Sequence, residues 1–374
     1  GASPLRVLLT ITAPALLPAV ASAASVVFLF CSTSFGIVLT LGGLRYANVE
    51  TEIYQLTTQE LDLRAAAALS VLQVVVITAL LLGSHLARRR APALGRAGER
   101  GRRPRRTDLG WFAWTAVVVV LLMTPLLSLA WASLHDDGGW TVANYRALQT
   151  TGAGNALLVT ATDALGRSLV IAVQAAAMAL VLGSVVAYLV SRRPRGRAVR
   201  RLAALFDGVF MLPLGVSAVT LGFGFLITLD HPPLDLRASP LLVPIAQAMV
   251  ALPLVVRTVA PVLGSIDPRQ REAAASLGAG PGRVLLVVDL PHAWRALTAA
   301  AGFAFAVSLG EFGATSFLAR DDSPTLPVVI FQLIGRPGAE NFGMAMAASV
   351  VLAAATGAVM LLVERLRVDA VGAF

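Results

Sequence analysis

The 374-residue sequence contains no lysine, a single cysteine and few charged residues, which make up 14% of the chain. The absence of lysine excludes an ATPase phosphate-binding loop, because that loop places a lysine on the nucleotide phosphates. A lone Cys31 excludes an intrachain disulfide framework and a cysteine-rich metal site. The four histidines are scattered and match no zinc-ligand spacing. We therefore predict no metal site, no cofactor and no catalytic residue in this chain.

Hydrophobic residues, in contrast, make up 57% of the chain, and the mean hydropathy is +0.77. Apolar stretches of about 18 or more residues are long enough to cross a bilayer as helices. Such stretches lie at eight places, residues 16–42, 65–87, 110–134, 166–191, 204–228, 239–262, 293–318 and 343–366. The sequence therefore predicts an all-α fold, a polytopic membrane bundle of about eight transmembrane helices.

Arginine supplies the basic charge, and it gathers in two short runs at residues 88–106 and 192–201. Arginine runs beside apolar spans mark the cytoplasmic side and favour anionic lipid. This placement predicts membrane lipid as a partner and no nucleic acid. Two spans separate the runs, so both fall on the same side, and continued alternation places residues 263–291 there as well.

An internal repeat relates the beginning of the chain to its last third. Residues 1–14, GASPLRVLLTITAP, align without gaps to residues 278–291, GAGPGRVLLVVDLP, and Phe35-Gly36 aligns to Phe312-Gly313 in the same register. Six spans separate the two copies, which therefore have the same orientation in the membrane. Such a parallel repeat differs from the inverted repeats of many secondary transporters.

The second copy belongs to a stretch from Arg271 to Pro291 that reads REAAASLGAGPGRVLLVVDLP. Glu272 and the alanines after it predict a short helix with the carboxylate in its first turn, ended by Gly278. Pro291 is expected to precede the next span. The alternative to a functional role is an ordinary loop between spans that carries an alanine-rich helix.

The spacing within this stretch resembles the EAA coupling loop of ABC importer permeases, in which EAA, three residues, glycine and nine residues precede Ile-x-Leu-Pro. Here valine replaces the isoleucine. The resemblance implies that two cytosolic ATPase subunits, which bind ATP and magnesium, dock on two such loops. The expected coupling residues are Glu272, Ala273, Ala274, Ala275, Ser276, Leu277, Gly278, Leu290 and Pro291, with Gly1 and Pro14 in the first copy.

The resemblance also implies a domain organisation. Residues 1–87 would be the C-terminal part of a first permease half with two spans, beginning inside its coupling loop, so that the sequence is truncated at its N-terminus. Residues 88–107 would form a basic cytoplasmic linker, and residues 108–374 a complete second half with six spans. An extracytoplasmic substrate-binding protein is the further expected partner, the bacterial cell membrane the expected location, and the chain itself would not be an enzyme.

Other segments resemble a branch of this family with two halves in one chain, the thiamine and ferric-iron permeases. They include residues 33–43, residues 211–217 and the sequence LGEFG at 309–313. Thiamine is the substrate that these motifs favour. Ferric iron or another small solute remains an alternative, and an ATP-independent secondary transporter is the alternative from a different class.

Glu311 is the candidate for contact with a substrate, because a carboxylate inside the membrane is costly and faces protein or water. One interpretation places it on the translocation path, where it would favour a cation. The other interpretation has Glu311 paired with a neighbouring span or reaching the outer surface of the membrane. Its repeat counterpart Ser34, together with Gly215 and Ser217, completes the expected path, and simple helix packing is the alternative for the glycine.

Overall fold

The computed structural model describes residues 1, 3–42, 45–89, 109–136, 138–192, 216–229, 236–237 and 239–368. Across these residues the regular structure is helical except for one hairpin, formed by β1 (His135–Asp136) and β2 (Gly139–Trp140). Six of the described helices are long and apolar enough to cross a membrane. They are α5 (Leu63–Arg89), α6 (Leu109–Ser133), α8 (Ala161–Ser191), α11 (Leu242–Ser265), the continuous stretch Pro281–Leu309 and α17 (Ala339–Val368). The predicted all-α membrane bundle is confirmed.

Two expected spans differ from the structure in their bounds. The first, residues 16–42, is divided into α2 (Ala13–Ser32), α3 (Phe35–Ile37) and a π turn, η2 (Val38–Gly42), by a break at Thr33 and Ser34. The seventh, residues 293–318, is wrong as a continuous helix. A helix instead runs from Pro281 to Leu309, and α15 (Thr315–Leu318) follows a break at 310–314.

The fifth expected span is described only in its second part. Residues 204–215 lie outside the described residues, and α10 (Ala218–Thr228) follows them. The Ser217 hydroxyl begins α10 by accepting a hydrogen bond from the Thr220 backbone N–H at 3.1 Å, a typical N-cap contact.

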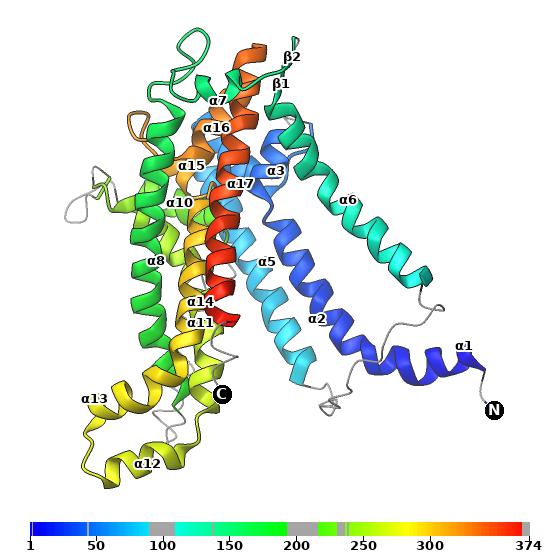
Figure 1. The fold of residues 1–374 in the computed structure, drawn as a ribbon, viewed down its shortest axis with the longest axis vertical. Helices are drawn as coiled ribbons and strands as arrows, with labels where there is room; N and C mark the ends of the chain where they lie inside the picture. The colour runs from blue at the N-terminus through cyan, green and yellow to red at the C-terminus, as the bar shows by residue number, and fades with distance from the viewer. Residues whose placement is uncertain are drawn as a thin grey trace.

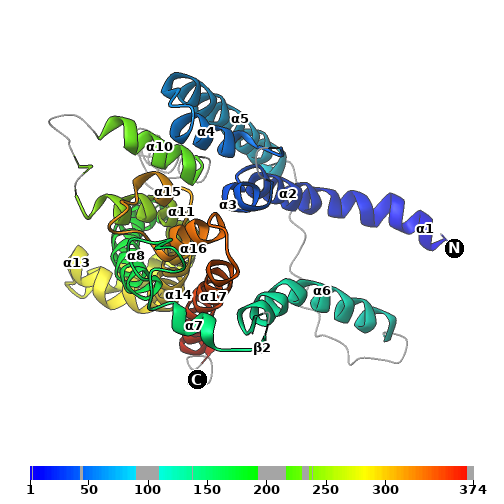
Figure 2. The same ribbon diagram turned by 90° about the horizontal axis from the view of Figure 1, so that it is seen from above.

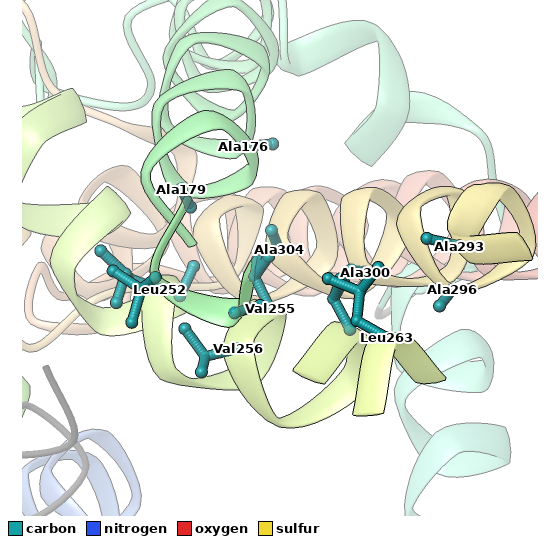
Figure 3. Close-up of a cluster of buried hydrophobic side chains, with 14 of the residues drawn as sticks. Ala176, Ala179, Leu252, Val255, Val256, Leu263, Ala293, Ala296, Ala300 and Ala304 are labelled. Carbon is teal, nitrogen blue, oxygen red and sulfur yellow. The ribbon is translucent and has the colours of Figure 1, made fainter. Parts of the chain in front are cut away.

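The centre of the bundle is formed by α8, α11 and α14 (Leu290–Leu309), which pack along one another (Figure 3). Their contact surfaces are rich in small residues, among them Ala176, Ala179, Ala300 and Ala304. Small side chains let helix backbones approach closely in a membrane, where apolar surface by itself drives little association. Gly183 shows how close the approach is, because a Cβ there would lie 2.7 Å from the Val255 side chain.

The parallel repeat extends well beyond the residues that reveal it in the sequence. In the first copy α1 (Pro4–Val7), η1 (Leu8–Thr12) and α2 follow one another. In the second copy α13 (Pro281–Val284), η5 (Leu285–Asp289) and α14 have the same lengths in the same order, each displaced by 277 residues. Later, α4 (Val49–Thr58) corresponds to α16 (Leu326–Ile334), and α5 to α17. The described helices thus follow the parallel repeat well beyond the aligned sequence, although α3 and η2 differ from the break and α15 at the corresponding positions.

The elements collect at two ends of the molecule (Figure 1). One end holds α12 (Pro268–Ser276), α13 and the last turns of α5 and α8, which lead into the two arginine runs. The opposite end holds α7 (Ala143–Ala147), the β hairpin and α16. This arrangement agrees with the sidedness expected from the arginine runs. We call the first end the inner end and the second the outer end.

Candidate functional site

The helix of the expected coupling loop, α12, projects from the inner end of the bundle (Figure 1). It begins at Pro268, four residues before Glu272, so the prediction that Glu272 lies in its first turn is wrong. The earlier start follows from Asp267, whose carboxylate accepts the Arg269 backbone N–H at 2.9 Å, and from proline at the first helical position. Glu272 therefore lies in the middle of the helix.

The other end of α12 is where the sequence predicts it. Gly278 has a φ of +86°, a left-handed conformation that glycine adopts without the strain of a Cβ. The Ala279 N–H returns to the Ala274 carbonyl oxygen at 3.0 Å and closes the last turn. No residue of α12 is buried, and the Leu277 side chain that follows it is 89% exposed. The helix and its end therefore present a free surface with one large apolar side chain.

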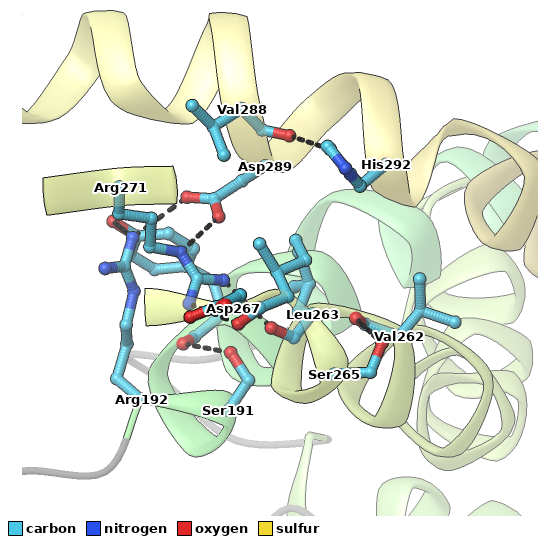
Figure 4. A network of polar contacts seen from close by, with 12 residues as sticks. Ser191, Arg192, Val262, Leu263, Ser265, Asp267, Arg271, Val288, Asp289 and His292 are labelled. Carbon is cyan, nitrogen blue, oxygen red and sulfur yellow. Dashed lines mark hydrogen bonds and ion pairs between the residues drawn. The ribbon is translucent and has the colours of Figure 1, made fainter. Parts of the chain in front are cut away.

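A buried carboxylate attaches this projecting helix to the bundle (Figure 4). Asp289 is fully buried, and its oxygens accept hydrogen bonds from Arg271 Nε at 2.7 Å and from Arg192 at 2.9 Å. Arg271 also donates to the Leu263 carbonyl oxygen at 2.9 Å. Arg271 belongs to α12, Arg192 follows α8, Leu263 lies on α11, and Asp289 lies in η5, which continues into α14. Movement of α12 is therefore linked directly to three helices of the bundle.

Leu290 and Pro291 lie apart from α12, at the first turn of α14. The expectation that Pro291 precedes the span is wrong, since the helix is continuous from Pro281 to Leu309. Proline has no N–H to donate and would break a regular α-helix, and the π turn η5 directly before it absorbs the mismatch. Pro14 follows η1 in the same way, and Gly1 and Pro14 are exposed at the inner end with α1.

The expected path residues gather toward the outer end. Glu311 lies in the break after α14, and its carboxylate accepts the backbone N–H groups of Ala314 at 2.7 Å and Thr315 at 3.0 Å, together with the Thr315 hydroxyl. The side chain is 6% exposed. All three donors lie within four residues of Glu311, in the break and at the start of α15, so the carboxylate closes the turn that leads into α15.

The counterparts Ser34 and Glu311 lie beside the place where the two repeats touch. Phe35 stacks on Phe312, its own repeat counterpart, with ring centroids 5.4 Å apart and planes at 21°. Ser217 is buried at the start of α10, which packs against the Glu311 loop. Gly215 lies outside the described residues. The structure therefore brings Ser34, Ser217 and Glu311 to one region, which we call the outer interface.

Three groups at key contacts of the structure were not among the residues expected from the sequence. Asp289 was visible as a charge inside an apolar run, which is the signal that could have marked it. Glu50 on α4 and Gln73 on α5 are buried and hydrogen-bonded to each other at 3.0 Å. For the pair of Glu50 and Gln73, the available signal was a glutamine in an otherwise apolar span.

Comparison with known proteins places this arrangement in a family. The family model described as binding-protein-dependent transport system inner membrane component matches residues 179–368, which include α12 and the second repeat copy. A thiamine transport system permease protein of Escherichia coli is 30% identical over 314 residues, which cover 83% of this chain and 56% of that protein. Its counterpart in Brucella abortus is 29% identical over 83% of this chain and 54% of its own length.

A molybdenum transport system permease protein of Haemophilus influenzae is 32% identical over 48% of this chain and 82% of that protein. The chain thus spans about half the length of the thiamine relatives. The family model matches more than half of the chain, and six described helices can cross a membrane. This chain belongs to the family of inner-membrane components of binding-protein-dependent transport systems.

Proposed function

We propose that this chain forms the translocation path of an ATP-driven importer and that thiamine is its substrate. The observation that carries the proposal is α12, an exposed helix with the EAA pattern that is anchored through Arg271 to the buried Asp289. The choice of thiamine is supported by the extent of the likeness. The thiamine permeases align with 83% of the chain, whereas the molybdenum permease aligns with 48%.

In this proposal two separate ATPase subunits bind ATP and magnesium and receive one coupling loop from each half of the permease. The small side chains of Ala273 and Ala275 are exposed and allow the backbone of α12 to approach a cleft closely. The exposed Leu277 supplies an apolar anchor. When the ATPases close, α12 moves, and the link through Asp289 transfers the movement to α8 and α14. A two-state bundle driven in this way needs no catalytic group of its own.

A substrate-binding protein would deliver the solute at the outer end. Ferric iron is the second candidate substrate from the sequence motifs, and other small solutes follow from the molybdenum relative and from a sulfate permease of Escherichia coli that is 35% identical over 46% of this chain. An ATP-independent transporter would have no use for a projecting anchored helix.

The test of the substrate is uptake of labelled thiamine by cells that lack the gene, with labelled ferric iron and molybdate measured in parallel. We expect thiamine uptake alone to be lost and to return with the complete gene. Uptake should stop when ATP is depleted and persist when proton and sodium gradients are collapsed. Loss of iron or molybdate uptake instead would overturn thiamine, and persistence of uptake without ATP would overturn the importer mechanism.

The test of the coupling loop is Glu272→Ala. We expect this exposed substitution to abolish uptake while the protein still inserts and can be purified. The matched control is Glu340→Ala, which removes an exposed carboxylate at the outer end, in the first turn of α17. Normal transport by the Glu272 variant would refute the assignment of α12 as the coupling helix.

A further inference from the structure

Two buried carboxylates lie near the outer interface, and they differ in the groups that donate hydrogen bonds to them. Glu311 is held by backbone and hydroxyl donors of its own loop. Glu50 is 1% exposed and receives no backbone donor from such a loop. Its Oε1 accepts a hydrogen bond from Gln73 Nε2 at 3.0 Å, and the Ser217 hydroxyl, which donates to the Thr220 hydroxyl at 3.2 Å, lies close to it. Separation of the elements around Glu50 would therefore free its carboxylate, while Glu311 would stay bound.

The partners of Glu50 come from both sides of the outer interface. Gln73 lies on α5, in the first repeat copy, whereas Ser217 and Thr220 lie at the start of α10. The Thr220 hydroxyl donates to Gln73 Oε1 at 3.1 Å and completes a polar chain across the interface. Seen from above, α4 and α5 lie beside α10 (Figure 2), and α4 contacts α10 directly.

In the described part of the chain, no cation accompanies this carboxylate. Among the described residues no arginine or histidine forms an ion pair with Glu50, and its partners there are an amide and a hydroxyl. Burial raises the pKa of Glu50 from 4.5 to about 7, with the bonds to Ser217 and Gln73 opposing the shift. A buried carboxylate is costly unless a positive charge or several hydrogen bonds accompany it. Stability alone does not account for this glutamate.

Aromatic rings continue from Glu50 across the interface. Tyr54 lies one helical turn after Glu50 on α4, and its ring centroid is 5.4 Å from that of Phe35. Phe35 stacks on Phe312, which in turn lies 5.3 Å from Phe331. Tyr54, Phe312 and Phe331 also line a cavity of about 180 Å³ that Arg320, Asp321 and Gln332 border, and Arg320 forms an ion pair with Asp322. Rings near a carboxylate are the combination that binds a planar organic cation.

We propose that Glu50 binds the positive charge of a planar organic cation as it passes the outer interface, with the rings of Tyr54, Phe35 and Phe312 against its plane. The proposal rests on the proposed function, because thiamine carries a permanently charged aromatic ring. Opening of the interface breaks the hydrogen bond from Thr220 to Gln73 and moves Ser217 away from Glu50, and the carboxylate then faces the path. The substrate cation takes the place of these donors.

The experiment compares Glu50→Gln with wild type in the complete transporter, reconstituted with its ATPases and binding protein in vesicles. Glutamine keeps the volume and the hydrogen-bonding capacity but removes the charge. We expect uptake of labelled thiamine at saturating loaded binding protein to fall at least tenfold, while stimulation of ATP hydrolysis by that protein is retained. Glu52→Gln is the matched control, because Glu52 lies in the same first turn of α4 and is less buried. It should transport normally.

A second variant separates charge from shape. Glu50→Asp keeps the charge and is expected to transport better than Glu50→Gln despite its shorter side chain. Thiamine uptake by Glu50→Gln within twofold of wild type would overturn the role of Glu50 and leave the proposed function standing. An equal fall in uptake and in ATPase stimulation would also overturn it, because that result indicates a packing role. Absence of thiamine uptake by the wild-type transporter would remove the proposed substrate, and this proposal with it.

Discussion

The attachment of α12 to the bundle can be tested by Asp289→Ala. The substitution removes a fully buried carboxylate and leaves two arginines without it, of which Arg271 is 15% and Arg192 is 37% exposed. Removal of one partner from a buried ion pair costs about 3–5 kcal/mol. Arg192 can turn toward water and recover part of its solvation, so the lower end, about 3 kcal/mol, applies here.

This loss should appear as local opening of α12, because a helix of nine residues does not persist in water without tertiary contacts. A cost of about 3 kcal/mol corresponds to roughly a hundredfold increase in the open population. Hydrogen exchange followed by mass spectrometry, on the purified protein in lipid nanodiscs, measures this change in the peptide covering Pro268–Ser276. We expect exchange there to accelerate by about two orders of magnitude, with the amides of α8 and α11 much less affected.

The control is Asp322→Ala, which breaks an exposed ion pair with Arg320 at 3.5 Å. Exposed pairs contribute about 0–1 kcal/mol, so this variant should leave α12 unchanged. Exchange in α12 of Asp289→Ala within threefold of wild type would refute the reasoning, since it would show that the helix is held by other contacts.

Three further predictions concern packing and the loop ends. Gly222→Ala should destabilise the purified protein by about 1–3 kcal/mol in thermal unfolding, because a Cβ there would lie 2.7 Å from the Ala314 Cα, whereas Gly224→Ala meets no atom within 4 Å and should be neutral. Glu311→Ala should lower the unfolding temperature, because it removes the acceptor of buried backbone donors. A loss of uptake without a loss of stability would contradict this structural role and support a role of Glu311 on the translocation path. Leu277→Ser should weaken co-purification of the ATPases without changing thermal stability, and unchanged co-purification would contradict its role as an anchor.

Features that depend on composition along one segment could be predicted from the sequence. Apolar length determines whether a helix can cross a bilayer, so the expected spans at 65–87, 166–191 and 343–366 lie within described helices. The repeat was also predictable, because fourteen aligned residues fixed an offset that the helix bounds then follow. The end of α12 was predictable because Gly278 alone can take its conformation without strain.

Features that depend on partners distant in the sequence could not be predicted. Asp289 is paired with Arg192, which lies 97 residues earlier, and Thr220 is hydrogen-bonded to Gln73 across 147 residues. The start of α12 was missed for a local reason, since the cap at Asp267 outweighed the helix-start signal of Glu272. The break after α14 was missed because the apolar run continues through it, and only the contacts of the Glu311 carboxylate reveal the turn.

The contact between Phe35 and Phe312 has a consequence for how such a protein can evolve. Two equivalent residues touch only near an axis that relates the repeats, so on the proposed translocation path a solute would meet both copies at once. Because both copies belong to one chain, a residue of one copy can be substituted while its counterpart stays the same. The counterpart of Glu50 is Pro327, and that of Glu311 is Ser34. A pair of identical subunits would offer every charge twice. A single chain can place one negative charge in one copy alone, which suits recognition of an asymmetric molecule with a single positive charge.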